Sequence, residues 1–159
     1  MIRFFSRCLY SLCLITSLAV AQAPIEALNK AQARLLVDPS QHQQPTLLTL
    51  WSLECAYCKK NLTQFGELLR QYPNIQLLTL ASEPATGEHA ALLQKLALPG
   101  RHFAYGNEAP EALAFAIDPN WRGELPRTLL FDGKGGRQAL SGVIAPQRAL
   151  QLLGLEPAR

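Results

Sequence analysis

The sequence predicts one α/β domain in which a central mixed sheet is flanked by helices. Residues 46–53 form an apolar run with the length and composition of a buried strand, and helical spacing begins directly after it. A second apolar run, residues 75–81, follows that helix, so the two strands are expected to be parallel. A proline-led strand at residues 125–132 precedes a glycine-rich turn and a returning strand, which predicts an antiparallel hairpin.

The first 21 residues predict a secretory signal peptide. Arg3 and Arg7 make the start positively charged, residues 8–20 are almost wholly apolar, and residues 19–21 are small enough for cleavage. An uncleaved membrane anchor is the alternative, but the apolar core is short for a span of about 20 residues. We therefore expect residues 22–159 to be a mature domain that is exported to the periplasm or otherwise leaves the cytoplasm.

The predicted mature chain is nearly neutral and keeps two cysteines. Removing the signal peptide leaves about 138 of the 159 residues, the size of one domain, and takes the net charge from +3 to about +1. This charge gives no case for binding nucleic acid or an anionic membrane surface. Cys8 and Cys13 are removed, which excludes a four-cysteine zinc site and disfavours a structural disulfide framework.

Cys55 and Cys58 lie where the predicted strand gives way to a helix. The unpaired N–H groups and the positive dipole end of a first helical turn favour a thiolate at Cys55. Cys58 lies about one turn further on the same side, close enough to attack a mixed disulfide formed at Cys55. The pair is predicted to cycle between dithiol and disulfide without another cofactor; an inert buried pair and a metal-binding pair are the alternatives.

The other elements alternate between helices and short strands, as judged from apolar periodicity and from proline and glycine breaks. The predicted helices cover residues 23–37, the stretch from the cysteines to Pro73, and residues 88–98, 110–117 and 145–153. The remaining predicted strands cover residues 102–105 and 137–143.

This order of elements resembles the thioredoxin fold. Residues 50–60 and 124–132 look like the matching strings of the exported thioredoxin-like proteins of the TlpA/ResA group, and the similarity runs from about residue 46 to 153. The resemblance implies that the peptide bond before Pro126 is cis and that Pro126 lies against the cysteines. It also implies an extra strand and helix between the Cys-x-x-Cys helix and the proline-led strand, in residues 83–120.

The same resemblance implies an exported thiol–disulfide oxidoreductase that acts mainly as a reductant of partner-protein disulfides, and we expect the chain to be a monomer. A membrane thiol-transfer protein would supply its electrons. Reduction of apocytochrome c, as in cytochrome c maturation, or of a copper-site cysteine pair is the work typical of the family. A Cu(I)-handling metallochaperone that uses the two thiolates, and a disulfide oxidase or isomerase, are the alternatives.

Four residues near the cysteines are candidates for binding a partner protein. Pro126 cannot donate a backbone hydrogen bond, and Leu125 before it can offer its backbone to an extended peptide. Tyr57, between the cysteines, is expected to be exposed and to influence partner choice. Trp51 either lines the site from the end of its strand or only packs in the core.

Two positions depart from the family pattern. The residue before the first cysteine is usually Trp but is Glu54 here, and its charge should raise the pKa of that cysteine. Plain thioredoxins bury an acid where this chain has Thr49. No metal site is predicted, and His42, His89 and His102 are each expected to be exposed loop or helix residues.

Overall fold

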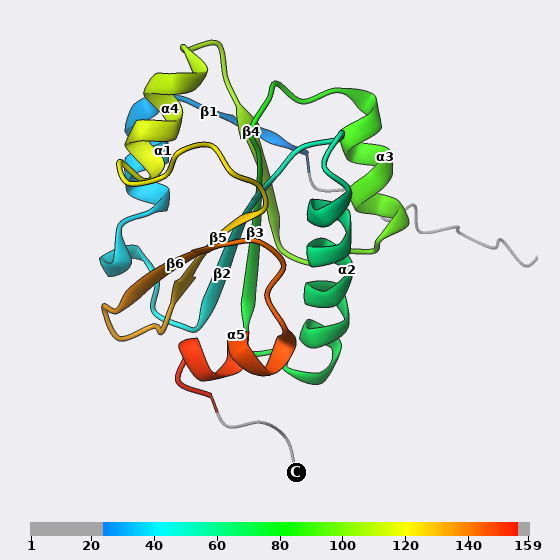
Figure 1. Cartoon of the computed structure of the whole chain (residues 1–159), viewed down its shortest axis with the longest axis vertical. Coiled ribbons are helices and arrows are strands. Elements are labelled where there is room, and N and C mark those ends of the chain that lie inside the picture. The colour runs from blue at the N-terminus through cyan, green and yellow to red at the C-terminus, as the bar shows by residue number, and fades with distance from the viewer. Residues whose placement is uncertain (1–23, 156–159) are drawn as a thin grey trace, which may run out of the picture.

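The computed structural model describes residues 24–155, which form a mixed sheet covered by helices on both faces (Figure 1). The order of its six strands within these residues is β1-β4-β3-β2-β5-β6. The strands are β1 (Glu26–Leu28), β2 (Thr46–Trp51), β3 (Gln76–Ala81), β4 (Arg101–Tyr105), β5 (Arg127–Phe131) and β6 (Arg137–Ser141). The helices are α1 (Lys30–Leu36), α2 (Ala56–Gln71), α3 (Gly87–Lys95), α4 (Pro110–Ile117) and α5 (Pro146–Leu152), with a 3-10 turn at Pro39–Gln41.

Strand β2 lies in the middle of the sheet, and all six of its residues are buried. It pairs in parallel with β3, where Thr49 lies opposite Thr79, and antiparallel with β5, where Leu50 lies opposite Arg127. Alternate β2 side chains enter two hydrophobic clusters, because successive residues of a strand point to opposite faces. Leu47 and Trp51 face the α2 side of the sheet, whereas Leu48 and Leu50 face the α1 and α4 side.

Helix α2 is held to the sheet by an apolar face and by one buried amide. Phe65 and Leu62 are fully buried in the core on this side. The side-chain nitrogen of Asn61 lies 3.4 Å from Thr49 Oγ1 and 3.3 Å from Thr128 Oγ1, on the neighbouring strands β2 and β5. The helix ends at Gln71, and its C-cap Tyr72 has a non-helical backbone because it precedes Pro73.

Most of the predicted elements are confirmed, with ends shifted by a few residues. The parallel pairing of the first two predicted strands and the hairpin near the end of the chain are both present. Residues 83–120 form α3, β4 and α4, and their interpretation as an insertion relative to plain thioredoxin stays a prediction. The predicted signal peptide lies outside the described residues. Among residues 24–155, no helix has the length and apolar character needed to span a membrane.

The predicted helix over residues 23–37 is wrong in its first part. Glu26–Leu28 is strand β1, which pairs in parallel with β4 at the edge of the sheet. The helix begins after Asn29, whose side chain accepts a hydrogen bond from the Gln32 N–H at 2.9 Å, while the Gln32 side chain accepts one from the Asn29 N–H. This reciprocal capping box fixes the start of α1 and leaves the preceding residues extended.

The prediction that the histidines are exposed is also wrong, because all three are buried. His42 stacks on Phe131 with ring centroids 3.8 Å apart, and its Nε2 lies 2.9 Å from the Leu36 carbonyl oxygen. His102 extends from β4 to Thr79 on β3, with Nδ1 and Oγ1 separated by 3.0 Å. These side chains are therefore packing elements with satisfied polar atoms.

Burial of the histidines predicts that acid destabilises the fold near neutral pH. Desolvation lowers the pKa of His42 and of His102 below the usual value of 6.5. The unfolded chain therefore binds protons first as the pH falls, and the free energy of unfolding should decrease between about pH 7 and pH 5. Urea denaturation at several pH values measures this, and a variant with both histidines changed to Gln should show a flatter profile.

A profile equally steep in that double variant would contradict the assignment. The carboxyl groups whose pKa values are lowered by hydrogen bonds, Asp38, Glu124 and Asp132, have usual values of 3.8 to 4.5 and titrate below this window.

Candidate functional site

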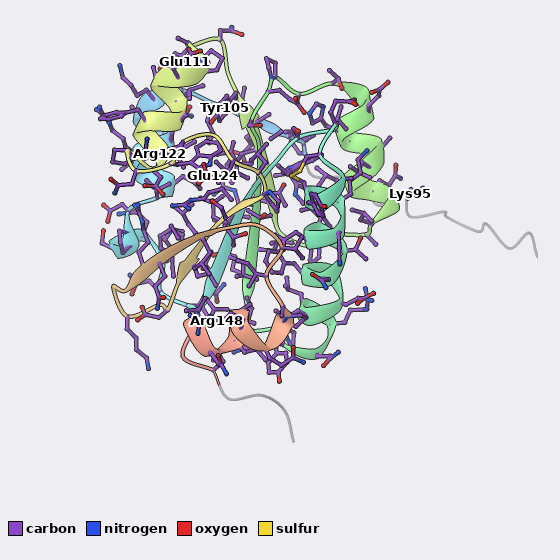
Figure 2. All side chains as sticks on the ribbon, in the orientation of Figure 1. Lys95, Tyr105, Glu111, Arg122, Glu124 and Arg148 are labelled. Carbon is purple, nitrogen blue, oxygen red and sulfur yellow. A yellow bond between two sulfur atoms is a disulfide. The ribbon has the colours of Figure 1, made fainter. Side chains whose placement is uncertain are left out.

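Cys55 and Cys58 form a disulfide at the N-terminus of α2, with Cα atoms 5.2 Å apart. The disulfide lies at the upper end of α2 in Figure 2. Cys55 is the N-cap residue, and its sulfur accepts a hydrogen bond from the Cys58 N–H at 3.0 Å. The sulfur thus takes the place of the oxygen that usually caps a helix, where backbone N–H groups and the helix dipole stabilise negative charge.

The two cysteines differ in their exposure to solvent. Cys58 is completely buried, whereas Cys55 is partly exposed. Tyr57 is 69% exposed, as predicted, and Glu54 and Lys59 on either side of the pair are also exposed. A visiting molecule can therefore reach Cys55 across a surface of mixed charge, while Cys58 is shielded from it.

The peptide bond between Leu125 and Pro126 is cis, as the resemblance implied. Leu50 lies opposite Arg127, so Pro126 is level with Trp51 at the end of β2 from which the chain continues to Cys55. Leu125 packs against the same hydrophobic cluster as Cys55. The Leu125 backbone forms no hydrogen bond with any other residue in 24–155, which leaves it available to an extended peptide.

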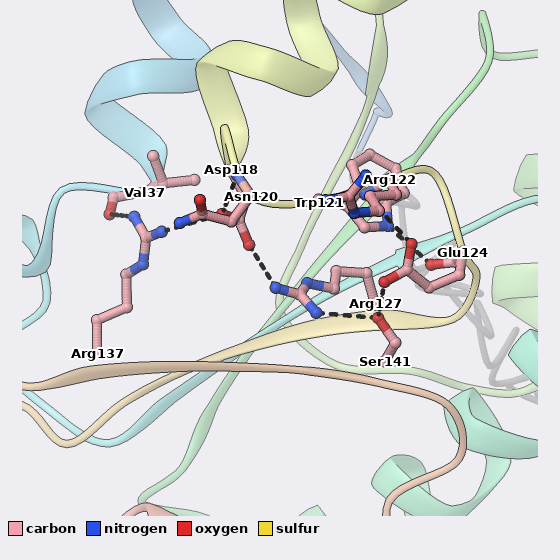
Figure 3. A network of polar contacts seen from close by, with 9 residues as sticks. All are labelled: Val37, Asp118, Asn120, Trp121, Arg122, Glu124, Arg127, Arg137 and Ser141. Atoms are coloured by element: carbon pink, nitrogen blue, oxygen red, sulfur yellow. Dashed lines mark hydrogen bonds and ion pairs between the residues drawn. The ribbon is translucent and has the colours of Figure 1, made fainter.

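A buried ion pair anchors the segment that carries this proline (Figure 3). Arg127 donates a 2.6 Å hydrogen bond to Asp118, whose side chain is 3% exposed. Arg137 approaches the same carboxylate at 3.8 Å. The start of β5 is therefore tied to the end of α4 and to β6.

The loop before the proline carries a second group of hydrogen bonds (Figure 3). The Trp121 indole N–H donates to the Glu124 carbonyl oxygen at 2.8 Å, and Ser141 donates to the Glu124 carboxylate at 2.9 Å. The backbone N–H of Glu124 and the Ser141 hydroxyl hold the pKa of the Glu124 carboxyl below its usual value. These bonds restrain the loop that leads to Pro126.

A shallow hollow of about 230 Å³ lies beside Leu125. It is lined in part by Tyr105, Trp121 and Ala114, and Figure 2 places Tyr105 next to α4. The Tyr105 hydroxyl is buried without a hydrogen-bond partner among the described residues, and burial raises the pKa of Tyr105 to about 12. The hollow extends the surface around the cis-proline loop.

Trp51 is 1% exposed and therefore belongs to the core. Its ring packs edge-on against His89 with centroids 5.3 Å apart, which favours the packing interpretation over direct contact with a partner. Thr49, in place of the buried acid of plain thioredoxins, lies in the neutral polar cluster around Asn61. Among residues 24–155, no group of three or more His, Cys, Asp or Glu side chains could hold a metal ion.

Sequence reasoning missed two residues near the pair, Glu83 and His89. The Glu83 carboxylate accepts a 2.8 Å hydrogen bond from the Leu53 N–H, two residues before Cys55, and lies 3.0 Å from His89 Nε2. Glu83 follows β3, which is parallel to β2, so its position at the same edge of the sheet as the cysteines was a usable signal.

The difference in access predicts selective alkylation of the dithiol form. We expect iodoacetamide to modify Cys55 at least about tenfold faster than Cys58. Only Cys55 is partly exposed, and its sulfur lies at the N-cap of α2, where a thiolate is stabilised. Fragment-ion mass spectrometry locates the modified residue. Both cysteines should react at similar rates in urea, and similar rates in the folded protein would contradict the assignment.

Comparisons with known proteins show the fold. No protein-family model matches the sequence, and a search of curated proteins finds no similar sequence. The structure is similar to a secreted disulfide oxidoreductase of Mycobacterium tuberculosis homologous to E. coli DsbE, at 15% identity and a TM-score of 0.54 over 71% of this chain and 80% of that one.

Two other similar structures have the same architecture. StoA of Bacillus subtilis gives 20% identity and a TM-score of 0.52 over 70% of this chain and 83% of that one. A thiol:disulfide interchange protein of the thioredoxin family from Chlorobium tepidum gives 9% identity and a TM-score of 0.58 over 84% of this chain and 95% of that one. The chain therefore has a thioredoxin-like fold, which confirms at the level of fold the resemblance read from the sequence.

Proposed function

We propose that the protein is an exported thiol–disulfide oxidoreductase that reduces disulfides in partner proteins. The observation that carries this proposal is the Cys55–Cys58 pair at the start of α2, with an accessible sulfur at the N-cap and a buried one a turn below. The similar structures of a secreted mycobacterial disulfide oxidoreductase and of a thiol:disulfide interchange protein support it.

The reaction begins from the dithiol form and transfers two electrons. The Cys55 thiolate attacks a sulfur of the partner disulfide, and the second partner sulfur leaves as a thiolate that takes up a proton. Cys58 then loses its proton and attacks the Cys55 sulfur of the mixed disulfide. The partner sulfur that was bonded to Cys55 leaves and is protonated, so the partner gains two thiols and the chain gains the Cys55–Cys58 disulfide.

In the proposed complex, the partner lies as an extended segment beside Cys55. The free backbone of Leu125 offers hydrogen bonds to such a segment, and Pro126 cannot compete for them as a donor. The exposed Tyr57 and the hollow beside Leu125 provide side-chain contacts on either side. We propose that these features select disulfides in flexible, accessible polypeptide over disulfides buried in folded domains.

Repeated turnover needs an external dithiol that returns two electrons to the Cys55–Cys58 disulfide. A membrane thiol-transfer protein is the proposed donor, because the predicted signal peptide places the protein outside the cytoplasm. Cysteine pairs of apocytochrome c or of a copper site are the proposed substrates. Both are exported dithiols that an oxidising compartment converts to disulfides.

Replacing Cys58 should trap the partner. In Cys58→Ala, the mixed disulfide at Cys55 has no internal thiol to resolve it, so covalent complexes should accumulate in cells that express the full chain. Non-reducing gels and mass spectrometry identify what is attached. The matched variant Cys55→Ala should trap at least about tenfold less, because its remaining sulfur is buried.

Failure of Cys58→Ala to trap any protein, while the wild-type chain remains functional in the same cells, would contradict the mechanism. Tight stoichiometric Cu(I) binding by the reduced protein with negligible disulfide reductase turnover would instead favour a copper chaperone.

A further inference from the structure

Glu83 joins the loop that follows β3 to the loop that presents Cys55. One carboxylate oxygen accepts the Leu53 N–H at 2.8 Å and lies 3.0 Å from His89 Nε2. Leu53 is two residues before Cys55, and the Cys55 N–H donates to the Ser52 carbonyl oxygen at 3.3 Å. The backbone on which the reactive sulfur sits is therefore tied to this carboxylate.

The hydrogen bonds of His89 define its tautomer and its role. The Thr86 N–H points at Nδ1 from 3.1 Å, and a backbone N–H can only donate, so Nδ1 carries no hydrogen. The ring hydrogen is then on Nε2, where it donates to Glu83. His89 is 1% exposed and packs against Trp51, so it is a fixed hydrogen-bond donor that orients the carboxylate.

These contacts form one continuous brace from α3 to the redox pair. Thr86 is the N-cap of α3, His89 lies in the first turn of that helix, and Glu83 connects it to Leu53. The brace approaches the Cys55 loop from the β3 side, whereas the cis-proline loop approaches from the β5 side. The loop that presents Cys55 thus leaves β2 between the strand that leads to Glu83 and the strand that follows Pro126.

The charge of Glu83 acts on the same loop. Its side chain is 36% exposed, so water screens the charge in part. The other charged groups around the pair are Glu54 on the same loop and Lys59 and Lys60 on α2, and all three are exposed. Glu83 differs from them because its carboxylate is fixed by hydrogen bonds toward the Cys55 backbone.

We propose that Glu83 is a positioning residue for thiol–disulfide exchange. His89 orients its carboxylate, which fixes the loop that presents Cys55. The negative charge of Glu83 also disfavours the Cys55 thiolate and so makes the cysteine pair more reducing. A cysteine pair becomes a stronger oxidant when its reduced form is stabilised. A negative charge that destabilises the reduced form therefore lowers the reduction potential. The role of Glu83 in catalysis rests on the function proposed above. Its effect on the dithiol–disulfide equilibrium of Cys55 and Cys58 does not, because that equilibrium can be measured without a partner protein.

The charge effect is tested with Glu83→Gln. A Gln side-chain oxygen can accept both hydrogen bonds in the same place, so this change removes the charge and keeps the brace. At about pH 8, equilibrium with reduced and oxidised glutathione should shift about threefold toward the dithiol, and the Cys55 thiol pKa, measured by alkylation rate against pH, should fall. The control Glu88→Gln removes an exposed charge from the first turn of α3 and should change neither.

The brace itself is tested with Glu83→Ala. Hydrogen exchange of the Leu53 amide should be at least about tenfold faster than in the wild-type protein, while Glu83→Gln should stay within about threefold of it. Circular dichroism checks that the alanine variant is folded; if it is not, the Gln variant alone decides the charge effect. An unchanged glutathione equilibrium in Glu83→Gln, or unchanged Leu53 exchange in a folded Glu83→Ala, would overturn the proposal.

These outcomes are distinct from failure of the proposed function. A wild-type protein that equilibrates with glutathione but reduces no protein disulfide would refute the reductase proposal, and the variants would still report on Glu83.

Discussion

The hydrogen bond from the Cys58 N–H to the Cys55 sulfur is the interaction on which the functional geometry depends. It makes a sulfur atom the N-cap of α2, so the helix begins where charge must develop during exchange. The same turn of helix buries the second sulfur directly behind the first. One local arrangement therefore places an exposed cysteine and a buried one where the proposed exchange needs its attacking and its resolving sulfur.

The rest of the fold keeps that helix start in place. Strand β2 is buried on both faces and delivers the chain to Cys55, and Asn61 ties α2 to the neighbouring strands through hydroxyl groups that do not titrate near neutral pH. Loops after β3 and before β5 reach the same edge of the sheet and contribute Glu83 and Pro126. The carboxyl edge of a sheet is where open α/β folds commonly place their sites.

The sequence predicted those elements whose structure depends on neighbouring residues. Apolar runs, proline breaks and the cysteine spacing predicted the strands, the α2 start and the redox pair, because each depends on neighbours within a few residues. Strand β1 was missed because its three residues pair with β4, more than 70 positions away. The burial of His42 likewise depends on stacking against Phe131, which no local pattern indicates.

The local features of the site were predicted from the sequence, and its long-range contacts were not. Cys55 and Cys58 follow from spacing, and the cis bond before Pro126 followed from the family resemblance rather than from composition. The contact of Glu83 with Leu53 could not be derived, because it joins segments 30 residues apart through a side chain. Long-range polar contacts of this kind depend on the register of parallel strands, which residue propensities alone do not determine.

The reduction potential of the Cys55–Cys58 pair in the purified protein is the most direct test of the proposed reductase function. Equilibration with dithiol buffers of known potential, followed by counting of free thiols, measures it. We expect complete and reversible exchange of two thiols at a potential closer to that of thioredoxin, about −270 mV, than to that of the strong oxidant DsbA, about −120 mV. A value near −120 mV, or no exchange with any dithiol, would contradict it.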